Sequence, residues 1–419
     1  MKRILVVHFA GDFREAWQRL QRDGSERYYG HAYILGELER LHQAHGAAGY
    51  LSCLAPHYRE TLPNGVTVMG ADADPGRKLR QVVEQIEHFA PTHLIVHGPM
   101  QPLLRWALRQ EFALACLFAD SFAQHPLYRW LRFRRLPALL GDPRVAFVAN
   151  HGVNAARGLV DLGVDAGKVI PWDFPHRNTP DHHAVKHAPG RLVPRLLYVG
   201  SLEPKKGVGD LIRAVAALAP DCPAHLDVVG AGQRQRFEDL AARIGVSERV
   251  RFHGLVPNAQ VHEMMAQADA IVVPSRHAFP EGLPLTLYEA LASRTPTIAS
   301  DHPMFAGHLE HGTSAAIFPA GNVQALAQTI GEVLGNRALY AQLSQGSRLA
   351  WNHMQVAVKW GDLIDRWVSG QPEDIAWLAA NSIGASDANG RAGTAGPKPK
   401  VPERKVPEPK GPETEMARK

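Results

Sequence analysis

Glu281 and Glu289 stand eight positions apart in the segment Pro274–Asp301, where a loop is predicted to turn into a helix. The residues LTLYEALAS are good helix formers and proline is tolerated in a first helical turn, so the helix should begin near Leu283 or Pro284. Backbone N–H groups at a helix start carry partial positive charge and suit a phosphate group. Glu281 just before the helix and Glu289 about two turns into it are suited to accept hydrogen bonds from hydroxyl groups. The pair therefore suggests a site that holds a phosphate between a sugar and a ribose.

The sequence on both sides of this loop favours that interpretation over a plainer one, in which Glu281 is a first-turn acid and Glu289 a solvated helix residue. A buried-looking strand, Asp269–Ser275, precedes the loop, and another, Thr295–Ser300, follows the helix. Ligands of open parallel sheets collect at the carboxyl ends of the strands, where this loop would lie. The segment resembles the retaining glycosyltransferases of family 4, whose glutamate-seven-residues-glutamate signature matches the pair. Their fold is the α/β type called GT-B, with two Rossmann-like domains facing across a cleft.

A second segment, Arg195–Leu218, carries the same resemblance. It reads as a hydrophobic strand, a glycine-bearing turn, a lysine pair and a helix with apolar residues at helical spacing. In the family, a lysine directly before a glycine reaches the donor diphosphate, which implies this role for Lys206 before Gly207. Lys205 is expected to be a solvated loop lysine.

The chain departs from the family pattern beside this turn. The family usually has an arginine directly after the strand's glycine or one place further, whereas Ser201 and Leu202 follow Gly200 here. One cation fewer near a diphosphate leaves less stabilisation of the leaving group. Arg276 is a candidate replacement, and an exposed loop arginine is the alternative. The resemblance thus implies a donor site made of Gly200, Ser201, Lys206, Arg276, Glu281, Gly282, Leu283, Pro284 and Glu289.

The resemblance also implies a role for each part of this site. Lys206 and the backbone amides near Gly282–Pro284 would stabilise the departing diphosphate, Glu281 would orient hydroxyls of the donor sugar, and Glu289 would bind the ribose. The segment His225–Pro257 reads as strand, glycine turn, helix and strand, and resembles the region that holds the base. Whether the base is uracil, guanine or adenine stays open.

The acceptor side is predicted in the first domain. Family members often place a histidine after the fourth strand, near the reacting sugar, and Ala119 stands at that place here. Asp120 is our candidate for the acceptor-side catalytic group, with His97 and His151 as alternatives. Each of the three also fits a structural role, because polar residues at strand ends commonly satisfy nearby backbone groups.

Strand and helix patterns alternate through the first half of the chain, which implies a parallel sheet. The predicted strands are Ile4–Phe9, Tyr50–Ala55, His93–His97, Leu114–Ala119 and Val145–Ala149, with helices such as His31–Ala47 and Arg77–Phe89 between them.

We expect an acceptor domain over residues 1–190 and a donor domain over 191–369, joined by a polar, histidine- and proline-rich segment. The amphipathic stretch Gln355–Val368 resembles the family's final helix, which crosses back to the first domain. Residues 370–419 are expected to be a linker and a tail. Beyond about Ile383 the composition is rich in Gly, Ala, Pro, Lys and Glu with a repeated KVPE, which predicts disorder.

Composition narrows the class of protein. A chain of 419 residues with 45% hydrophobic content suggests two to three domains with ample cores. It has no apolar run of the ~20 residues that a spanning helix needs. The cysteines Cys53, Cys116 and Cys222 are odd in number and scattered, which argues against a disulfide framework. A cytoplasmic protein is therefore expected.

We expect neither a metal nor another cofactor. The short spans His308–His311 and Asp181–His183 gather ligand types, but neither has a zinc-site spacing. In the resembling family, the lysine and the helix N-terminal amides balance the charge.

The segment His125–Leu140 clusters arginines among Trp, Tyr, Phe and Leu. As a basic amphipathic helix it would suit an anionic membrane surface and a lipid-linked acceptor. The alternative is a surface helix with solvated arginines and its aromatic side chains in the core. The net charge of +5 is mild and no nucleic-acid-binding motif is present, so nucleic acid is not an expected partner.

The expected function is transfer of a sugar from a nucleotide-diphosphate donor to a glycan or lipid-linked hydroxyl acceptor, with retention of anomeric configuration. One alternative is a sugar-nucleotide epimerase on the same fold, which needs no acceptor. Another is an inactive partner protein, in which Ser201 and Ala119 mark lost chemistry.

Overall fold

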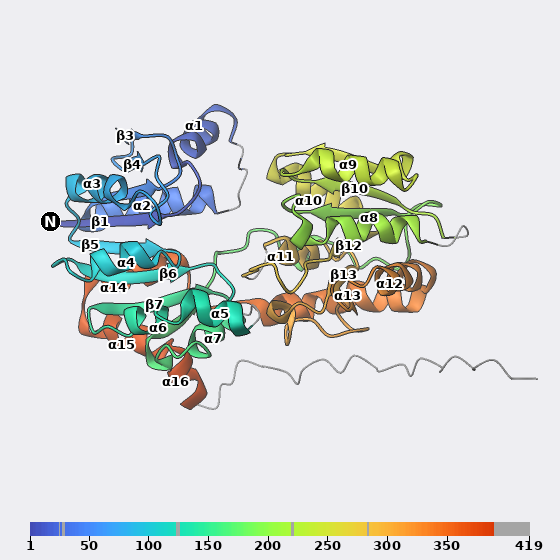
Figure 1. The fold of residues 1–419 in the computed structure, drawn as a ribbon. Helices are drawn as coiled ribbons and strands as arrows, with labels where there is room; N and C mark the ends of the chain where they lie inside the picture. Colours follow the sequence, from blue (N-terminus) through green and yellow to red (C-terminus); the bar gives the residue numbers. More distant parts are fainter. Residues whose placement is uncertain (25, 27–29, 123–125, 219–221, 283–284, 389–419) are drawn as a thin grey trace, which may run out of the picture.

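The computed structural model describes residues 1–388 apart from 25, 27–29, 123–125, 219–221 and 283–284. The predicted donor residues Leu283 and Pro284, and the tail from 389 on, lie outside the described residues. Two sheets lie side by side, each with helices packed on it (Figure 1).

The first sheet has the strand order β3-β4-β2-β1-β5-β6-β7-β8, and it is parallel except where β3 pairs with β4. Its strands are β1 Lys2–His8, β2 Gly46–Ser52, β3 Tyr58–Thr61, β4 Thr67–Gly70, β5 His93–His97, β6 Ala113–Phe118, β7 Val145–His151 and β8 Val169–Trp172. The helices are α1 Phe13–Asp23, α2 His31–His45, α3 Leu79–Phe89, α4 Gln101–Ala107, α5 Pro126–Phe133, α6 Leu136–Leu140 and α7 Val153–Val160. Five of these strands match the predicted ones, while β3, β4 and β8 are additional.

Both faces of this sheet are buried, as a parallel sheet requires. Successive side chains of a strand point to opposite faces. In β1, Leu5 and Val7 accordingly belong to one hydrophobic cluster, and Ile4 and Val6 belong to the other. The continuous apolar run at the start of the chain is thus a central strand with helices on both sides.

The second sheet is parallel throughout, with the order β11-β10-β9-β12-β13-β14. Its strands are β9 Arg195–Val199, β10 His225–Val229, β11 Val250–Gly254, β12 Ala270–Val273, β13 Thr297–Ser300 and β14 Ala316–Phe318. The helices are α8 Val208–Ala216, α9 Arg234–Arg243, α10 Asn258–Gln267, α11 Leu285–Ala292, α12 Val323–Gly335 and α13 Arg337–Met354.

After α13 the chain returns to the first domain. Helices α14 Trp360–Ser369, α15 Pro372–Ala380 and α16 Ile383–Ala388 lie against that domain (Figure 1). Trp360 and Leu363 are fully buried in the cluster that contains Ile4, and Ile383 is buried in the cluster on the other face. The linker and tail expected from residue 370 is therefore wrong for 370–388. Residues 372–380 and 383–388 form helices, and Ile383 together with the partly buried Trp377 and Leu378 packs against the two hydrophobic clusters of the first domain.

Candidate active site

The Lys206 ammonium group contacts the Glu281 carboxylate across 75 positions of sequence. Lys206 ends the short 3-10 helix η3, Pro204–Lys206, after β9, and Glu281 lies in the loop after β12. Ser275 Oγ donates a 2.7 Å hydrogen bond to the same carboxylate oxygen, and Glu281 is only 5% exposed. The Lys206 nitrogen also lies 4.4 Å from the centre of the Phe279 ring. The result is a nearly buried ion pair at the carboxyl ends of two adjacent parallel strands.

Gly207 permits this close approach. Its φ is +78°, and a Cβ at this position would lie 2.0 Å from the carbonyl oxygen of Pro274. An L-residue would be strained there and would push the two loops apart. The same two loops are also joined by a hydrogen bond of 2.9 Å, which the Arg276 backbone N–H donates to the Lys205 carbonyl. A glycine directly after Lys206 thus holds the lysine turn against the loop that bears Glu281.

The donor loop also touches the first domain. A Cβ on Gly282 would lie 3.0 Å from the carbonyl oxygen of Ala119, the residue that follows β6. The next residue, Asp120, is held by Asn150, which accepts from the Asp120 N–H at 3.2 Å and donates to its carbonyl at 2.9 Å. Two residues predicted for different sides of the reaction, Glu281 and Asp120, therefore each adjoin the same backbone contact between the domains.

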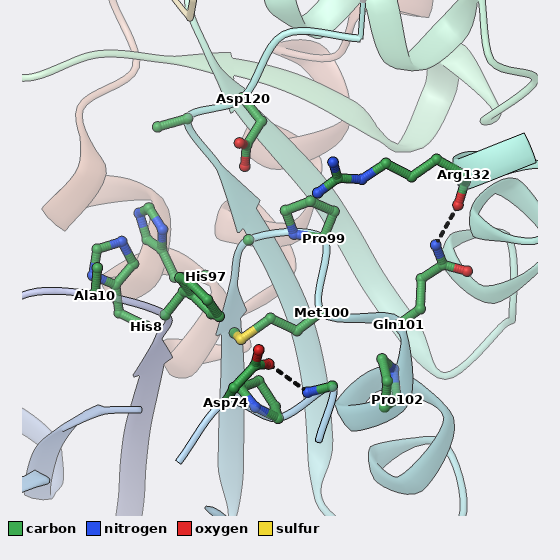
Figure 2. A pocket seen from close by; sticks show the side chains of 15 residues that line it. His8, Ala10, Asp74, His97, Pro99, Met100, Gln101, Pro102, Asp120 and Arg132 are labelled. Carbon is green, nitrogen blue, oxygen red and sulfur yellow. Dashed lines mark hydrogen bonds between the residues drawn. The ribbon is translucent and has the colours of Figure 1, made fainter. Parts of the chain in front are cut away.

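Asp120 reaches into a cavity of about 520 Å³ at the carboxyl end of the first sheet (Figure 2). Burial raises the pKa of Asp120, and the charge of Arg132 partly opposes this. Across the cavity, the imidazoles of His8 and His97 meet edge to face with ring centres 4.6 Å apart. Burial lowers the pKa of His8 to about 4 and that of His97 well below its ordinary value, so both rings are neutral at pH 7. The cavity combines a carboxyl group, a guanidinium and neutral imidazoles, groups that can hydrogen-bond a hydroxylated ligand.

Other predicted donor residues line the same end of the second sheet. Glu289 lies on α11 and its carboxylate is 3.2 Å from His262 Nε2 on α10. The Ser201 carbonyl accepts a 2.8 Å hydrogen bond from the hydroxyl of Tyr198. Burial, and then the charge of Glu281, raise the pKa of Tyr198 well above its ordinary value. Gly200 lies against the loop after β10, because a Cβ on Gly230 would stand 1.9 Å from the Gly200 carbonyl oxygen.

Arg276 has a different partner from the one expected. Its guanidinium forms two hydrogen bonds, of 2.7 and 2.6 Å, with the carboxylate of Asp210 in the first turn of α8. This pair raises the pKa of Arg276. The backbone of Arg276 contacts the lysine turn. Its guanidinium, however, pairs with Asp210 and not with Lys206 or Glu281.

Of the two alternative acceptor-side histidines, His97 lines the cavity and His151 does not. His151 is 4% exposed and its Nε2 lies 2.9 Å from Asp173. Asp173 is fully buried and also accepts from His176 Nε2 at 3.1 Å. Burial alone would raise the pKa of Asp173, but the hydrogen bonds from His151 and His176 hold it below its ordinary value. His151 therefore belongs to the connection between the domains.

Ser275 and Phe279 beside the ion pair were not predicted as site residues, and neither were His8 and Arg132 in the cavity. Ser275 could have been found, because it ends the predicted strand that leads into the donor loop. His8 and Arg132 gave no local signal, because they come from β1 and α5, which only the fold brings together.

The two spans that gather metal-ligand residue types in the sequence are His308–His311 and Asp181–His183. Within the described part of the chain, no group of three His, Cys, Asp or Glu side chains is placed to hold a metal ion. The ring of His311 accepts from the backbone N–H of Ile317 at 3.0 Å.

Among the residues that the structure describes, none of the helices combines the length and the apolar character that crossing a bilayer requires.

Residues 185–350 match the family model described as glycosyl transferases group 1. This range contains Lys206, Glu281 and Glu289. A D-inositol 3-phosphate glycosyltransferase of Jonesia denitrificans is 29% identical over 209 residues, covering 46% of this chain and 48% of that protein. A phosphatidyl-myo-inositol mannosyltransferase of Mycobacterium leprae is 32% identical over 152 residues, covering 36% and 39%. The chain thus spans about half or less of the length of these relatives.

Solved structures resemble the whole two-domain arrangement. A sucrose-phosphate synthase from Thermosynechococcus elongatus has a TM-score of 0.64 at 18% identity, covering 84% of this chain and 95% of that one. The Anabaena protein HepE, solved with UDP-glucose, has a TM-score of 0.63 at 16% identity, covering 88% and 98%. The GT-B fold expected from the sequence is confirmed.

Proposed function

We propose that this protein is a retaining glycosyltransferase of family 4 that moves a sugar from a nucleotide-diphosphate donor to a hydroxyl acceptor in glycan, polysaccharide or glycolipid synthesis. The observation that carries the proposal is the buried Lys206–Glu281 pair, held where the donor loop touches the first domain at Ala119. Lys206 offers a cation for a diphosphate and Glu281 a carboxylate for sugar hydroxyls. The loop that carries Glu281 touches Ala119, which lines the cavity that contains Asp120. The family model that covers these donor residues supports the same chemistry.

In the donor-bound state Lys206 would contact the diphosphate, whose oxygens are charged acceptors for the ammonium group. Glu281 would then accept hydrogen bonds from hydroxyls of the donor sugar, and Glu289 from the ribose. Gly200, Ser201 and the backbone of Gly282 would approach the phosphates. The Arg276 guanidinium pairs with Asp210. Arg276 would therefore support the donor site through its backbone hydrogen bond to the lysine turn and not through its charge.

The acceptor would enter the cavity in the first domain, with its hydroxyl near Asp120. The bond between the anomeric carbon and the diphosphate oxygen breaks as the acceptor oxygen bonds to the same face of that carbon. The departing phosphate takes the acceptor proton, and Lys206 stabilises the charge that develops on it. Asp120 would position the acceptor hydroxyl. No metal is assigned a step, since the ammonium group and the backbone amides supply the positive charge.

The cavity lined by His8 and His97 favours transfer over epimerisation, because it offers an acceptor site that a donor-only reaction does not need. The retained Lys206–Glu281 pair argues against an inactive partner protein. A lipid-linked acceptor, a cytoplasmic location and a membrane contact through residues 125–140 complete the proposal. The solved UDP-glucose complex of HepE makes UDP-sugars the first donors to test.

The deciding experiment incubates the protein with UDP-, GDP-, ADP- and TDP-sugars and candidate acceptors, and follows the products by NMR. A new glycosidic bond with the anomeric configuration of the donor is expected. Glu281→Gln should abolish it, while the exposed Glu332→Gln on α12 should leave it unchanged. A free sugar nucleotide with inverted stereochemistry at another carbon would instead establish the epimerase.

A further inference from the structure

Helix α5 presents an apolar face to the surface of the protein. Leu127, Trp130 and Leu131 are 61, 55 and 61% exposed, and their spacing of three and four residues puts them on one side of the helix. Phe133 is 4% exposed and packs edge to face on Phe122 in the core, which anchors the opposite side. We call Leu127, Trp130 and Leu131 the α5 face. Its three large apolar side chains lie together, which is typical of a surface that meets another apolar phase.

The surroundings of the α5 face are basic. Arg132, Arg134 and Arg135 are exposed and Arg129 is half-buried, and the sequence holds no acidic residue from 126 to 141. The Arg134 guanidinium lies 5.1 Å from the centre of the Trp130 ring, so its charge stays at the level of the apolar face. Tryptophan and arginine side by side suit the boundary between lipid headgroups and acyl chains. This combination of charge and apolar surface is complementary to an anionic bilayer.

The same helix forms one edge of the cavity in the first domain. Arg132 lines the cavity, and its carbonyl accepts a 2.8 Å hydrogen bond from Gln101 Nε2 at the start of α4 (Figure 2). A bilayer in contact with the α5 face would therefore meet the protein beside the cavity that contains Asp120.

We propose that the α5 face docks on an anionic lipid bilayer and that the cavity beside it receives the headgroup of a membrane lipid. The docking itself does not depend on the glycosyltransferase activity. The assignment of the acceptor as a lipid headgroup rests on the proposed function.

The test measures sedimentation of the protein with vesicles of phosphatidylcholine, with and without phosphatidylglycerol. The wild type should bind the phosphatidylglycerol vesicles, and added salt should weaken the binding. Trp130→Ser/Leu131→Ser should reduce binding at least tenfold. Each of Arg129→Gln, Arg134→Gln and Arg135→Gln should reduce it about fivefold. The matched control Leu255→Ser/Leu349→Ser changes leucines that are 57 and 50% exposed elsewhere, and should bind like the wild type.

Three outcomes would overturn the docking proposal: no binding, equal binding to both vesicle types, or full binding by the Trp130→Ser/Leu131→Ser variant. A fourth outcome comes from sedimentation of the protein without vesicles. If the wild type is a dimer and the Trp130→Ser/Leu131→Ser variant is a monomer, the α5 face binds a second copy of the chain. Circular dichroism checks that each variant is folded. If vesicles bind but no sugar reaches any lipid, the docking stands and the lipid acceptor is wrong.

Discussion

The hydroxyl of Tyr288, on the donor helix α11, lies 2.7 Å from the buried Asp173 Oδ2 and 2.6 Å from the carbonyl oxygen of Met354. Asp173 follows the last strand of the first sheet, and Met354 ends the helix before the chain crosses back. His176 also stacks on the Tyr288 ring at 3.9 Å between centres. The residue directly before Glu289 thus contacts both segments that connect the domains.

Tyr288→Phe should loosen the relative orientation of the two domains, because it removes the hydrogen bond and leaves buried acceptors without this donor. The expected loss of stability is about 1–3 kcal/mol. We also expect turnover to fall more than the affinity for donor. Tyr340→Phe is the matched control, since the Tyr340 hydroxyl donates to Asp269 within the second domain at 2.8 Å.

Spin labels at the exposed positions Glu84 on α3 and Glu332 on α12 would report the distribution of distances between the domains, in a Cys222→Ser background. The distribution should broaden for Tyr288→Phe and not for Tyr340→Phe. Equal distributions in both variants would show that this contact does not set the domain orientation.

Lys206→Ala should weaken the binding of UDP or another accepted nucleoside diphosphate about 10- to 100-fold, because a charge-assisted hydrogen bond is lost. Lys205→Ala, which changes the exposed neighbour, should bind like the wild type. Isothermal titration calorimetry measures both. Equal losses in the two variants would mean that Lys206 acts only through the general charge of the loop.

The same substitution should lower stability without ligand, since it leaves the nearly buried Glu281 carboxylate without its cation. The double variant Lys206→Ala/Glu281→Gln should recover part of this loss. Thermal unfolding of the single and double variants checks the coupling.

His8 should make the protein less stable in acid. Burial lowers its pKa from 6.5 to about 4, so the unfolded chain takes up the proton first as the pH falls. Its contribution is fully present above pH 6.5 and is lost between pH 6.5 and about 4, by about 3 kcal/mol. Replacing it by leucine should flatten this part of the stability curve, whereas the same change at the exposed His225 should not. An unchanged acid slope in the His8→Leu variant would contradict the assignment.

Leu363→Ala should destabilise the first domain by about 2–5 kcal/mol, although residue 363 follows the second domain in sequence. Leu363 is fully buried on α14 against the first sheet, whereas Leu349 on α13 is 50% exposed. Leu349→Ala is therefore the control. Urea unfolding followed by hydrogen exchange would show the loss in strands β1 and β2, and a loss confined to the second sheet would refute the prediction.

The sequence predicted those parts of the fold that local pattern determines. Apolar runs such as Ile4–Phe9 and the alternation of strand and helix were sufficient for the parallel sheet. The strand β8 was missed because it is short and contains Pro171, a residue that weakens a strand pattern in the sequence and is tolerated here because β8 is an edge strand. Residues 370–388 were missed because their helices depend on surface that the first sheet provides, which composition does not reveal.

The candidate site divides in the same way. Lys206 and Glu281 were both assigned to the donor site from motifs at the ends of strands, which the βαβ pattern brings to one edge, whereas their contact with each other is a finding of the structure. The pairing of Arg276 with Asp210 depends on side-chain directions 66 positions apart in sequence, and no periodicity encodes these. His8 and Arg132 share a cavity only because β1 and α5 meet in three dimensions.

The return of the chain to the first domain has a consequence for biosynthesis. The core of the first domain includes Trp360 and Ile383, which leave the ribosome after every strand of the second sheet. A nascent chain that has emerged only to residue 350 holds the hydrophobic cluster of residues 196–343 but lacks these side chains of the first core. The domain that is translated first would therefore be the last to complete its fold, in contrast to the usual order from the N-terminus.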